Sequence, residues 1–411
     1  MCDFMDLEFN DAQMPASSEF YIPEAIECMR CGQCVSGCPT FRLFQIHEET
    51  PRGRLRTISK ILVDDSPIST KELEHLNNCV QCRACEAICP SKMVYGKLFD
   101  AVQEKLQTPL NSLAKTAFYF IEHKNHRAWL MPFLKGYLKS GLRKSLQASK
   151  LLEKVNLANA EKLLTEPALK PLFEIYPTNS AGRGNVALFT GCVTEHFDSE
   201  TLEATIKLLN ANGFNVKIPK QQSCCGAIHQ HNGQSATHLI ENNLAVFNAL
   251  DVDTVIHVAT GCGAMLSEYE NEDFKQKLFD INEFLLANWS DDLKLASSNL
   301  KVAVHEPCSQ RNVLKNQQSV YSLLKKISDL TVFALADNHI CCGSGGSYML
   351  THPENAMQLR DLKQQTIHDA KVDLVVSSNF GCVIHLNSET TNIVHPLVLL
   401  AQQINSKSTS P

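Results

Sequence analysis

Hydrophobic and polar positions in the second half of the chain alternate between two patterns. Short apolar runs, typical of buried strands, cover residues 185–189, 253–258, 302–304 and 374–376. Longer segments with apolar residues at helical spacing lie between them, such as 201–210 and 355–369. Strands that alternate with helices predict a parallel sheet, whose ligands bind beyond the carboxyl ends of the strands.

The cysteines of this half recur in the same order around the predicted strands. Each copy has one cysteine after a strand, then an adjacent pair followed by glycine, then a last cysteine after glycine. The first copy contains Cys192, Cys224, Cys225 and Cys262, and the second contains Cys308, Cys341, Cys342 and Cys382. A repeat with so long a period indicates a duplicated domain. We therefore expect two repeated α/β domains, over 181–295 and 296–411, each with four thiols on one rim.

Four convergent thiols per copy suit zinc and an iron–sulfur cluster equally well. The alternative, buried unreacted cysteines, requires eight coincidences of position. His305 and His385 lie three residues from Cys308 and Cys382, His339 lies close to the second pair, and Met265 occupies the place that matches His385. A lone histidine is more often a packing residue, but His385 is a candidate ligand. We expect the second set to bind its metal or cluster more tightly.

The first part of the chain contains two complete C-x2-C-x2-C-x3-C-P runs, at 28–39 and 79–90. This is the spacing with which bacterial ferredoxins bind [4Fe-4S] clusters, and in two-cluster ferredoxins the fourth cysteine binds the other cluster. The predicted ligands are Cys28, Cys31, Cys34 and Cys89 for one cluster, and Cys79, Cys82, Cys85 and Cys38 for the other. Zinc gives no reason for two complete runs, and disulfides do not fit closely spaced cysteines without a signal peptide.

The length, net charge and cysteine count limit the classes of protein and the cellular location that the sequence allows. At 411 residues the chain is longer than a ferredoxin, and its net charge of −6 gives no support to nucleic-acid binding. No apolar run has the length of a membrane span, and the acidic N-terminus does not resemble a targeting peptide, so we expect a cytoplasmic location. Of the seventeen cysteines, only Cys2 lies outside the motifs above. The helical ferredoxin domain is expected over 1–105.

A helical basic connector is expected over 106–180, where aromatic residues are interleaved with Lys and Arg. Such a stretch can lie on an anionic membrane surface, or it can join domains with its apolar side packed on the ferredoxin domain. Pro132, Gly136 and Gly141 should break a long helix, which favours the connector. The arginines of the segment 51–54 are expected to offset the negative charge of thiolate-bound clusters.

The order of these modules resembles the iron–sulfur subunits of glycolate oxidase along essentially the full length. The matching segments are 28–40, 51–54, 79–91, 224–227, 260–264, 341–344 and 381–386. Related subunits with two CCG cysteine-rich domains occur in anaerobic glycerol-3-phosphate dehydrogenase and heterodisulfide reductase. The heterodisulfide reductase repeat has a further cysteine where this chain has Met265 and His385.

The resemblance implies an electron-transfer role, with no catalytic residue in this chain. FAD-containing partner subunits would oxidise a 2-hydroxy acid, glycolate or D-lactate, and this chain would pass electrons to a membrane acceptor such as quinone, from the inner face of the cell membrane. The absence of a dinucleotide fingerprint agrees with a chain that binds no flavin. One alternative is a heterodisulfide-reductase-like or anaerobic glycerol-3-phosphate dehydrogenase iron–sulfur subunit. Another is a non-enzymatic scaffold with structural zinc in the CCG domains.

Overall fold

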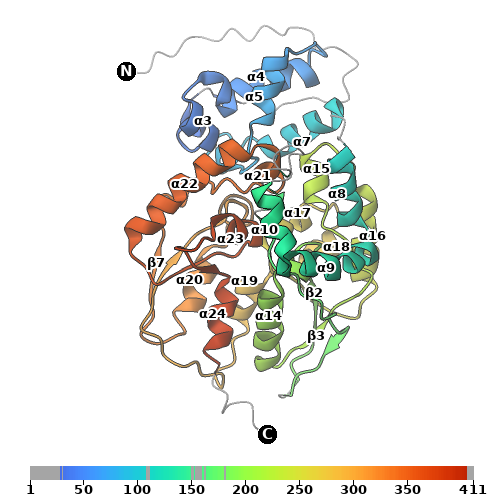
Figure 1. Cartoon of the computed structure of the whole chain (residues 1–411), viewed down its shortest axis with the longest axis vertical. Coiled ribbons are helices and arrows are strands. Elements are labelled where there is room, and N and C mark those ends of the chain that lie inside the picture. Colours follow the sequence, from blue (N-terminus) through green and yellow to red (C-terminus); the bar gives the residue numbers. More distant parts are fainter. Residues whose placement is uncertain are drawn as a thin grey trace.

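The computed structural model describes residues 28–29, 31–107, 112–149, 152, 160–161, 163–179 and 182–404, so Cys2 lies outside the described residues. The described N-terminal part is helical (Figure 1). Its elements are α2 (Gln33–Ser36), α3 (Pro39–Phe44), η1 (His47–Glu49), α4 (Pro51–Leu62), α5 (Thr70–Asn77), α6 (Ala84–Ala87) and α7 (Tyr95–Leu106).

Helix α4 organises this part because its N-terminus is capped and its apolar face is buried. The Thr50 hydroxyl accepts a hydrogen bond from the Gly53 backbone N–H at 2.9 Å, and Pro51 occupies the first helical position. Ile58 and Leu62 lie on the buried face of α4 and pack in the same cluster as Phe99 of α7. This cluster also contacts cysteines of both ferredoxin runs, so the helices fix the positions of the thiols.

The first α/β part holds five strands in the order β1-β3-β2-β4-β5, and only β1 is antiparallel to its neighbour among these pairs. The strands are β1 (Ile175–Tyr176), β2 (Asn185–Phe189), β3 (Asn215–Lys217), β4 (Val255–His257) and β5 (Leu278–Asp280). The helices are α13 (Thr194–Phe197), α14 (Ser199–Ala211), α15 (Ala227–His231), α16 (Thr237–Asn248), α17 (Thr260–Ser267), α18 (Glu272–Lys277) and α19 (Ile281–Ala287).

The second α/β part holds four parallel strands in the order β7-β6-β8-β9. The strands are β6 (Lys301–Val304), β7 (Thr331–Ala334), β8 (Leu374–Val376) and β9 (Ile393–Val394). The helices are the π-helix η2 (Ser309–Leu314), α20 (Gln318–Leu324), α21 (Tyr348–Thr351), α22 (Pro353–Ala370), α23 (Phe380–Leu386) and α24 (Pro396–Gln402).

These elements confirm the strands and helices predicted from the hydrophobic pattern, although the strand expected over 253–258 covers only Val255–His257. The central strands β2 and β6 lie at equivalent positions in their two sheets. One hydrophobic cluster joins both sheets, with Leu188 on one side and Val304 on the other. Helices α14 and α24 lie side by side at this junction, below the N-terminal helices in Figure 1.

The connector forms α8 (Ser112–Glu122), α9 (Lys124–Lys139) and α10 (Gly141–Ala148). The expectation that Pro132 and Gly136 would break the helix is wrong, because α9 runs through both residues and ends at Lys139. Pro132 and Gly136 are exposed. An interior proline removes one backbone hydrogen bond and crowds the carbonyl four residues before it, which can bend a helix without ending it.

The connector also packs differently from the expectation. Its side-chain contacts reach the first α/β part: Glu122 bonds His229, Ile121 contacts the core around Phe189, and Lys124 pairs with Glu195 at 3.0 Å. The apolar contact expected on the ferredoxin helices is therefore made, through Ile121, with the first α/β part. Within the described part of the chain, no helix is both long enough and apolar enough to cross a membrane.

Gly53 provides a test of how α4 is placed. A Cβ added to Gly53 would lie 2.3 Å from the carbonyl oxygen of His47, which is backbone and cannot rotate away. We expect Gly53→Ala to lower the free energy of unfolding of the anaerobic holoprotein by about 1–3 kcal/mol, measured by guanidinium denaturation.

Gly136→Ala is the matched control, because nothing lies within 4 Å of a Cβ added at this position in the last turn of α9. This variant should be more stable by up to about 1 kcal/mol, since alanine has the higher helix propensity. Equal stability changes in the two variants would contradict the packing of α4 on the His47 turn.

Candidate iron–sulfur centres

The two ferredoxin runs have the same local backbone. In each run, a left-handed residue follows the second cysteine and opens a four-residue helix: Gly32, with φ of 80°, precedes α2, and Arg83, with φ of 56°, precedes α6. Cys38 then adopts an extended conformation before Pro39, as residues before proline do. The first three sulfurs of a run can therefore surround one centre while the fourth is directed away.

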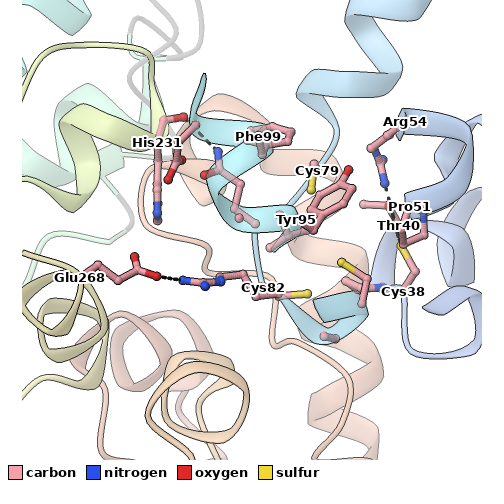
Figure 2. Close-up of a pocket in the computed structure, with 18 residues that line it drawn as sticks. Cys38, Thr40, Pro51, Arg54, Cys79, Cys82, Tyr95, Phe99, His231 and Glu268 are labelled. Atoms are coloured by element: carbon pink, nitrogen blue, oxygen red, sulfur yellow. Dashed lines mark hydrogen bonds and ion pairs between the residues drawn. The ribbon is translucent and has the colours of Figure 1, made fainter. Parts of the chain in front are cut away.

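The structure brings the predicted quartets together in two neighbouring pockets. The second quartet, which is Cys38, Cys79, Cys82 and Cys85, lines one pocket together with the rings of Tyr95 and Phe99. Figure 2 shows sulfurs of this quartet facing a common space beside Tyr95. The first quartet, which is Cys28, Cys31, Cys34 and Cys89, lines the other pocket, and Cys85 lines both.

Burial and mutual proximity oppose ionisation of these thiols. Burial raises the pKa of Cys82 and of Cys85 well above the usual value, and neighbouring thiols raise both further. Burial and the nearby Cys28 and Cys31 raise the pKa of Cys34 to about 11. Thiolates here therefore need a positive partner, which the iron of a cluster supplies when it displaces the protons. The donor set fits an iron–sulfur cluster.

Arg54 is the buried cation beside the second quartet, as the sequence led us to expect for the segment 51–54. Its Nη1 lies 3.9 Å from the Cys38 sulfur and donates to the Glu49 carbonyl at 2.7 Å. Arg54 also pairs with the buried carboxylate of Glu49, and Asn78 Nδ2 donates to the same carboxylate at 2.7 Å. This network holds one guanidinium at a fixed position next to the sulfur.

Each CCG set pairs its cysteines in the same way. The sulfur of the first cysteine lies near the first member of the adjacent pair, with Sγ–Sγ distances of 3.4 Å for Cys192 and Cys224 and 3.9 Å for Cys308 and Cys341. The second member lies near the last cysteine of its set. Cys342 and Cys382 are 3.4 Å apart. The two CCG sets therefore share one arrangement, in which the adjacent pair connects the first cysteine of the set to the last.

Glycines after the adjacent pairs shape these sites. Gly226 and Gly343 have φ of 91° and 93°, and their N–H groups point at the sulfurs of Cys224 and Cys341 at 3.5 and 3.4 Å. An N–H directed at sulfur favours the thiolate. Helix α15 begins directly after Gly226, whereas no described helix begins between Gly343 and Tyr348.

The histidines near the second CCG set lie in three different environments. His385 Nε2 is bonded to the Ala356 carbonyl at 3.1 Å, so the structure does not bring this candidate ligand into the sulfur site. His339 is exposed. His305 is buried, and one ligand atom of His305 lies within 4.8 Å of the sulfurs of Cys342 and Cys382.

The second quartet lies beside the second CCG set. Cys82 and Cys308 pack against the same buried cluster. Burial raises the pKa of Cys82, and repulsion from the Cys308 thiol raises it further. Asn312, in the π-helix after Cys308, donates to the Cys82 carbonyl at 2.7 Å. The sequence carried no signal for this contact.

The two CCG sets also approach each other. The Asn379 side chain accepts from the Gly261 N–H at 3.1 Å, next to Cys262, and its Nδ2 lies 3.5 Å from the Cys382 sulfur. Asn379 therefore links the first CCG set to the second. Sequence reasoning missed Asn379, because its role depends on how the two copies face each other.

Comparison with known proteins agrees with this arrangement. Residues 24–93 match the model of the 4Fe-4S dicluster domain, and residues 186–267 and 302–387 each match the model of the CCG cysteine-rich domain. The probable glycolate oxidase iron–sulfur subunit of Bacillus subtilis is 32% identical over 393 residues, which cover 88% of each chain. The chain belongs to the glycolate oxidase iron–sulfur subunit family.

Two further relatives extend the comparison. The glycolate oxidase iron–sulfur subunit of Escherichia coli is 27% identical over 411 residues, covering 92% of this chain and 94% of that one. Lactate utilization protein A of Shouchella clausii is 27% identical over 247 residues, covering 54% of this chain and 99% of that one. As a member of this family, the chain is an iron–sulfur electron-transfer subunit with an oxidoreductase-related role.

Asp100 gives a pH test of the contact between α7 and the first CCG domain. Its Oδ2 accepts a hydrogen bond from Gln230 Nε2 at 2.7 Å, and burial raises the pKa of Asp100 to about 7. The folded state therefore binds this proton more tightly than the unfolded state. This contribution to stability is full below about pH 4 and is lost as the pH rises to about 7.

We expect wild-type protein to lose about 1 kcal/mol of unfolding free energy through Asp100 between pH 6 and pH 8.5. Asp100→Asn keeps an oxygen acceptor for Gln230 and should remove this slope, whereas Asp369→Asn, at an exposed position of α22, should keep it. Guanidinium denaturation of the anaerobic holoprotein at both pH values measures the difference. An unchanged slope in Asp100→Asn would contradict the burial of this carboxyl group.

Proposed function

We propose that the chain is the iron–sulfur subunit of a flavin-dependent 2-hydroxy-acid dehydrogenase complex, with glycolate or D-lactate as substrate. Electrons would enter from an FAD-containing partner subunit and leave to a membrane acceptor such as quinone. One observation carries the proposal: the sulfur sites are contiguous. Cys85 lines the pockets of both quartets, Cys82 and Cys308 pack against one buried cluster, and Asn379 links the two CCG sets.

The proposed ligand sets are those predicted from the sequence. Cys28, Cys31, Cys34 and Cys89 would hold one [4Fe-4S] cluster, and Cys79, Cys82, Cys85 and Cys38 the other. The eight CCG cysteines would hold zinc or further clusters. A bound [4Fe-4S] cluster accepts and donates single electrons, which suits a carrier that receives them from a two-electron flavin donor.

The protein's own contribution is to exclude water and to place fixed charge. Tyr95 and Phe99 are buried and cover one side of the second quartet, and dry surroundings shape the reduction potential of a cluster. Arg54, held by Glu49, places a positive charge beside Cys38 and would stabilise the electron-rich reduced state. The names of the relatives support glycolate or lactate as the substrate of the complex.

The exposed side of α9 suits a peripheral position on the inner face of the cell membrane. Trp129 and Phe133 are 67% and 60% exposed, and their ring centroids are 4.9 Å apart. Leu142 of α10 is also exposed and lies next to Arg143 and Lys144 in the sequence. Aromatic and basic residues together favour the surface of an anionic bilayer.

Serine substitutions test the proposed exchange of the fourth cysteines. In electron paramagnetic resonance spectra of the reduced chain, Cys38→Ser should change the same cluster signal as Cys82→Ser, and Cys89→Ser the same signal as Cys31→Ser. The reason is that Cys38 shares a pocket with Cys82, and Cys89 with Cys31. Cys38→Ser spectra that match Cys31→Ser instead would show that each run binds its own cluster.

A reconstituted complex tests the function. Glycolate or D-lactate should reduce the clusters only when an FAD-containing 2-hydroxy-acid-oxidising subunit is added, and electrons should then reach quinone in anionic vesicles. A double change, Trp129→Ala with Phe133→Ala, should slow quinone reduction severalfold without affecting reduction of a soluble dye, since only the bilayer contact is lost.

Phe279→Ala is the control for this experiment, because Phe279 is also an exposed aromatic residue but belongs to β5 and not to the connector. It should leave both activities unchanged. Oxidation of glycolate by the flavin-free chain alone, or no cluster reduction by any of the 2-hydroxy acids with the partner present, would overturn the proposed function.

A further inference from the structure

We propose that His305 is a ligand of the metal or cluster in the second CCG set, so that the two CCG sites have different donor sets. The inference rests on the proposed metal binding by these sets. His305 would contribute an imidazole nitrogen beside the sulfurs of Cys342 and Cys382. The first CCG set would be held by sulfur without a corresponding imidazole.

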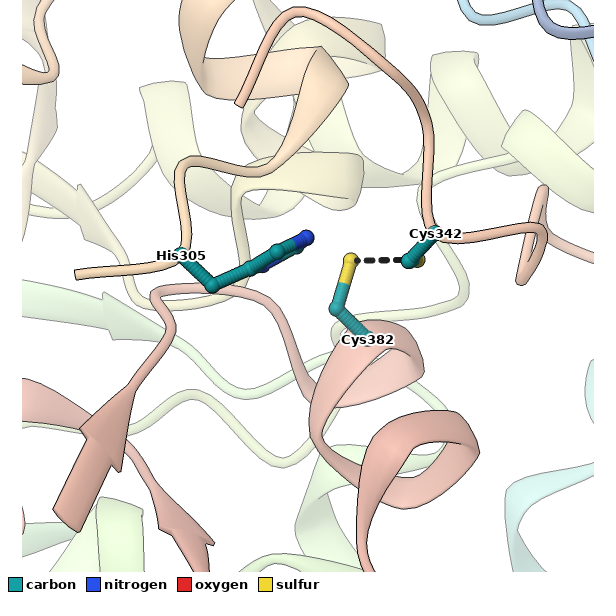
Figure 3. Close-up of side chains that lie close together, drawn as sticks. All are labelled: His305, Cys342 and Cys382. Atoms are coloured by element: carbon teal, nitrogen blue, oxygen red, sulfur yellow. Dashed lines mark hydrogen bonds between the residues drawn. The ribbon is translucent and has the colours of Figure 1, made fainter. Parts of the chain in front are cut away.

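The first argument is the position of the three ligand atoms. One nitrogen of His305 and the sulfurs of Cys342 and Cys382 all lie within 4.8 Å of one another (Figure 3). Ligands about 2.0–2.3 Å from one ion lie within such a distance of each other. All three residues are buried, and among the described residues no other group of three histidine, cysteine or acidic side chains meets this spacing.

The second argument is the way the imidazole is held. His305 directly follows β6, and its backbone N–H donates to the Val376 carbonyl at 2.9 Å, which extends the pairing with β8. On the ring, Nδ1 lies 3.0 Å from the Ser377 hydroxyl. Nε2 is therefore the nitrogen left to face the sulfurs. Metal-bound histidines are oriented in this manner, by a hydrogen bond from the nitrogen that does not bind metal.

The third argument comes from the repeat. Three residues before the first cysteine of its set, the second copy has His305 and the first copy has Phe189. Five residues before the last cysteine, the second copy has Ser377 and the first copy has His257. Phe189 and His257 are direct cross-strand partners on β2 and β4. The two copies therefore carry a histidine on different strands. In the second copy His305 follows β6, whereas in the first copy His257 lies on β4, the strand equivalent to β8.

His257 does not take the role of His305 in the first set. Its ring lies against the backbone of α17, since a Cβ added to Gly263 would be 2.1 Å from the ring carbon Cε1. Its Nδ1 is 3.8 Å from an oxygen of Asp280, on β5. The Phe189 ring instead lies near Cys262, because both are within 3.6 Å of a Cβ added to Gly191. A phenyl ring supplies no ligand.

A nitrogen ligand would also set the direction of electron flow between the CCG sites if both hold clusters. Replacing a thiolate by a neutral imidazole lowers the negative charge on a cluster and raises its reduction potential. The second CCG site, which adjoins Cys82, would then be the easier of the two to reduce. Electrons that arrive from the second quartet would therefore reduce the second CCG site before any further transfer.

The test compares the full chain with and without this nitrogen, purified anaerobically after growth on 15N-histidine or on unlabelled histidine. Pulsed electron paramagnetic resonance detects a nitrogen coordinated to a paramagnetic cluster, and zinc-edge X-ray absorption detects one coordinated to zinc. We expect a coordinated nitrogen in wild type, its loss in His305→Gln and in His305→Cys, and its retention in the matched control His257→Gln.

His305→Cys is included in case His305→Gln does not fold. A thiolate in place of the imidazole should keep the metal while removing the nitrogen signal. Ser377→Ala should keep the nitrogen but weaken retention of the metal against a chelator by roughly ten- to a hundredfold, as loss of the orienting hydrogen bond does. Unchanged ferredoxin cluster signals in each variant report that the rest of the chain is intact.

Several outcomes would overturn the assignment of His305: no coordinated nitrogen in wild type, a nitrogen signal that persists in His305→Gln, or equal loss in His257→Gln. If Cys342→Ala leaves the total metal content unchanged, the second set holds no metal and the premise fails with the inference. These results are independent of the partner flavoprotein, so they are separate from failure of the proposed 2-hydroxy-acid activity.

Discussion

The structure depends on one electrostatic constraint, which is the burial of many thiols close together with few positive side chains near them. Each buried thiol opposes ionisation of its neighbours, as the raised pKa values of Cys82, Cys85 and Cys342 indicate. In the second quartet, Arg54 is the buried cation that approaches sulfur. Such sites are stable as thiolates only around a cation, so metal binding and folding of these regions are coupled.

This constraint explains where the rigid elements are placed. Buried helices fix the ferredoxin runs, and the carboxyl ends of parallel strands fix the CCG cysteines. The contacts between parts of the chain gather around the same sites: Asn312 bonds the carbonyl of Cys82, and Asn379 joins Gly261 to the sulfur of Cys382. Close packing between parts shortens the distance between neighbouring sulfur sites, which a one-electron carrier requires.

The duplicated domain shows how one fold can surround two sets of cysteines with unlike side chains. The sulfur pairing and the left-handed glycines are common to both copies. The residues that approach the last cysteine differ, with Phe189 in one copy and His305 in the other. Because these are strand-end positions, a change of side chain alters the donor set without disturbing the sheet.

The sequence by itself determined the features that depend on local spacing. Cysteine spacing and the prolines predicted the quartets that line the two pockets, and the apolar pattern predicted the central strands and the repeat. Only the tertiary structure decided which histidine faces sulfur. His385 is the sequence neighbour of Cys382 on α23, yet it bonds the Ala356 carbonyl of α22, whereas His305 reaches the site from a different strand. It also decided that the connector packs on the first CCG domain and that Cys82 and Cys308 pack against one buried cluster. Spacing along a chain fixes which side chains share one turn or strand, but contacts between elements depend on how those elements pack, and no local pattern encodes that.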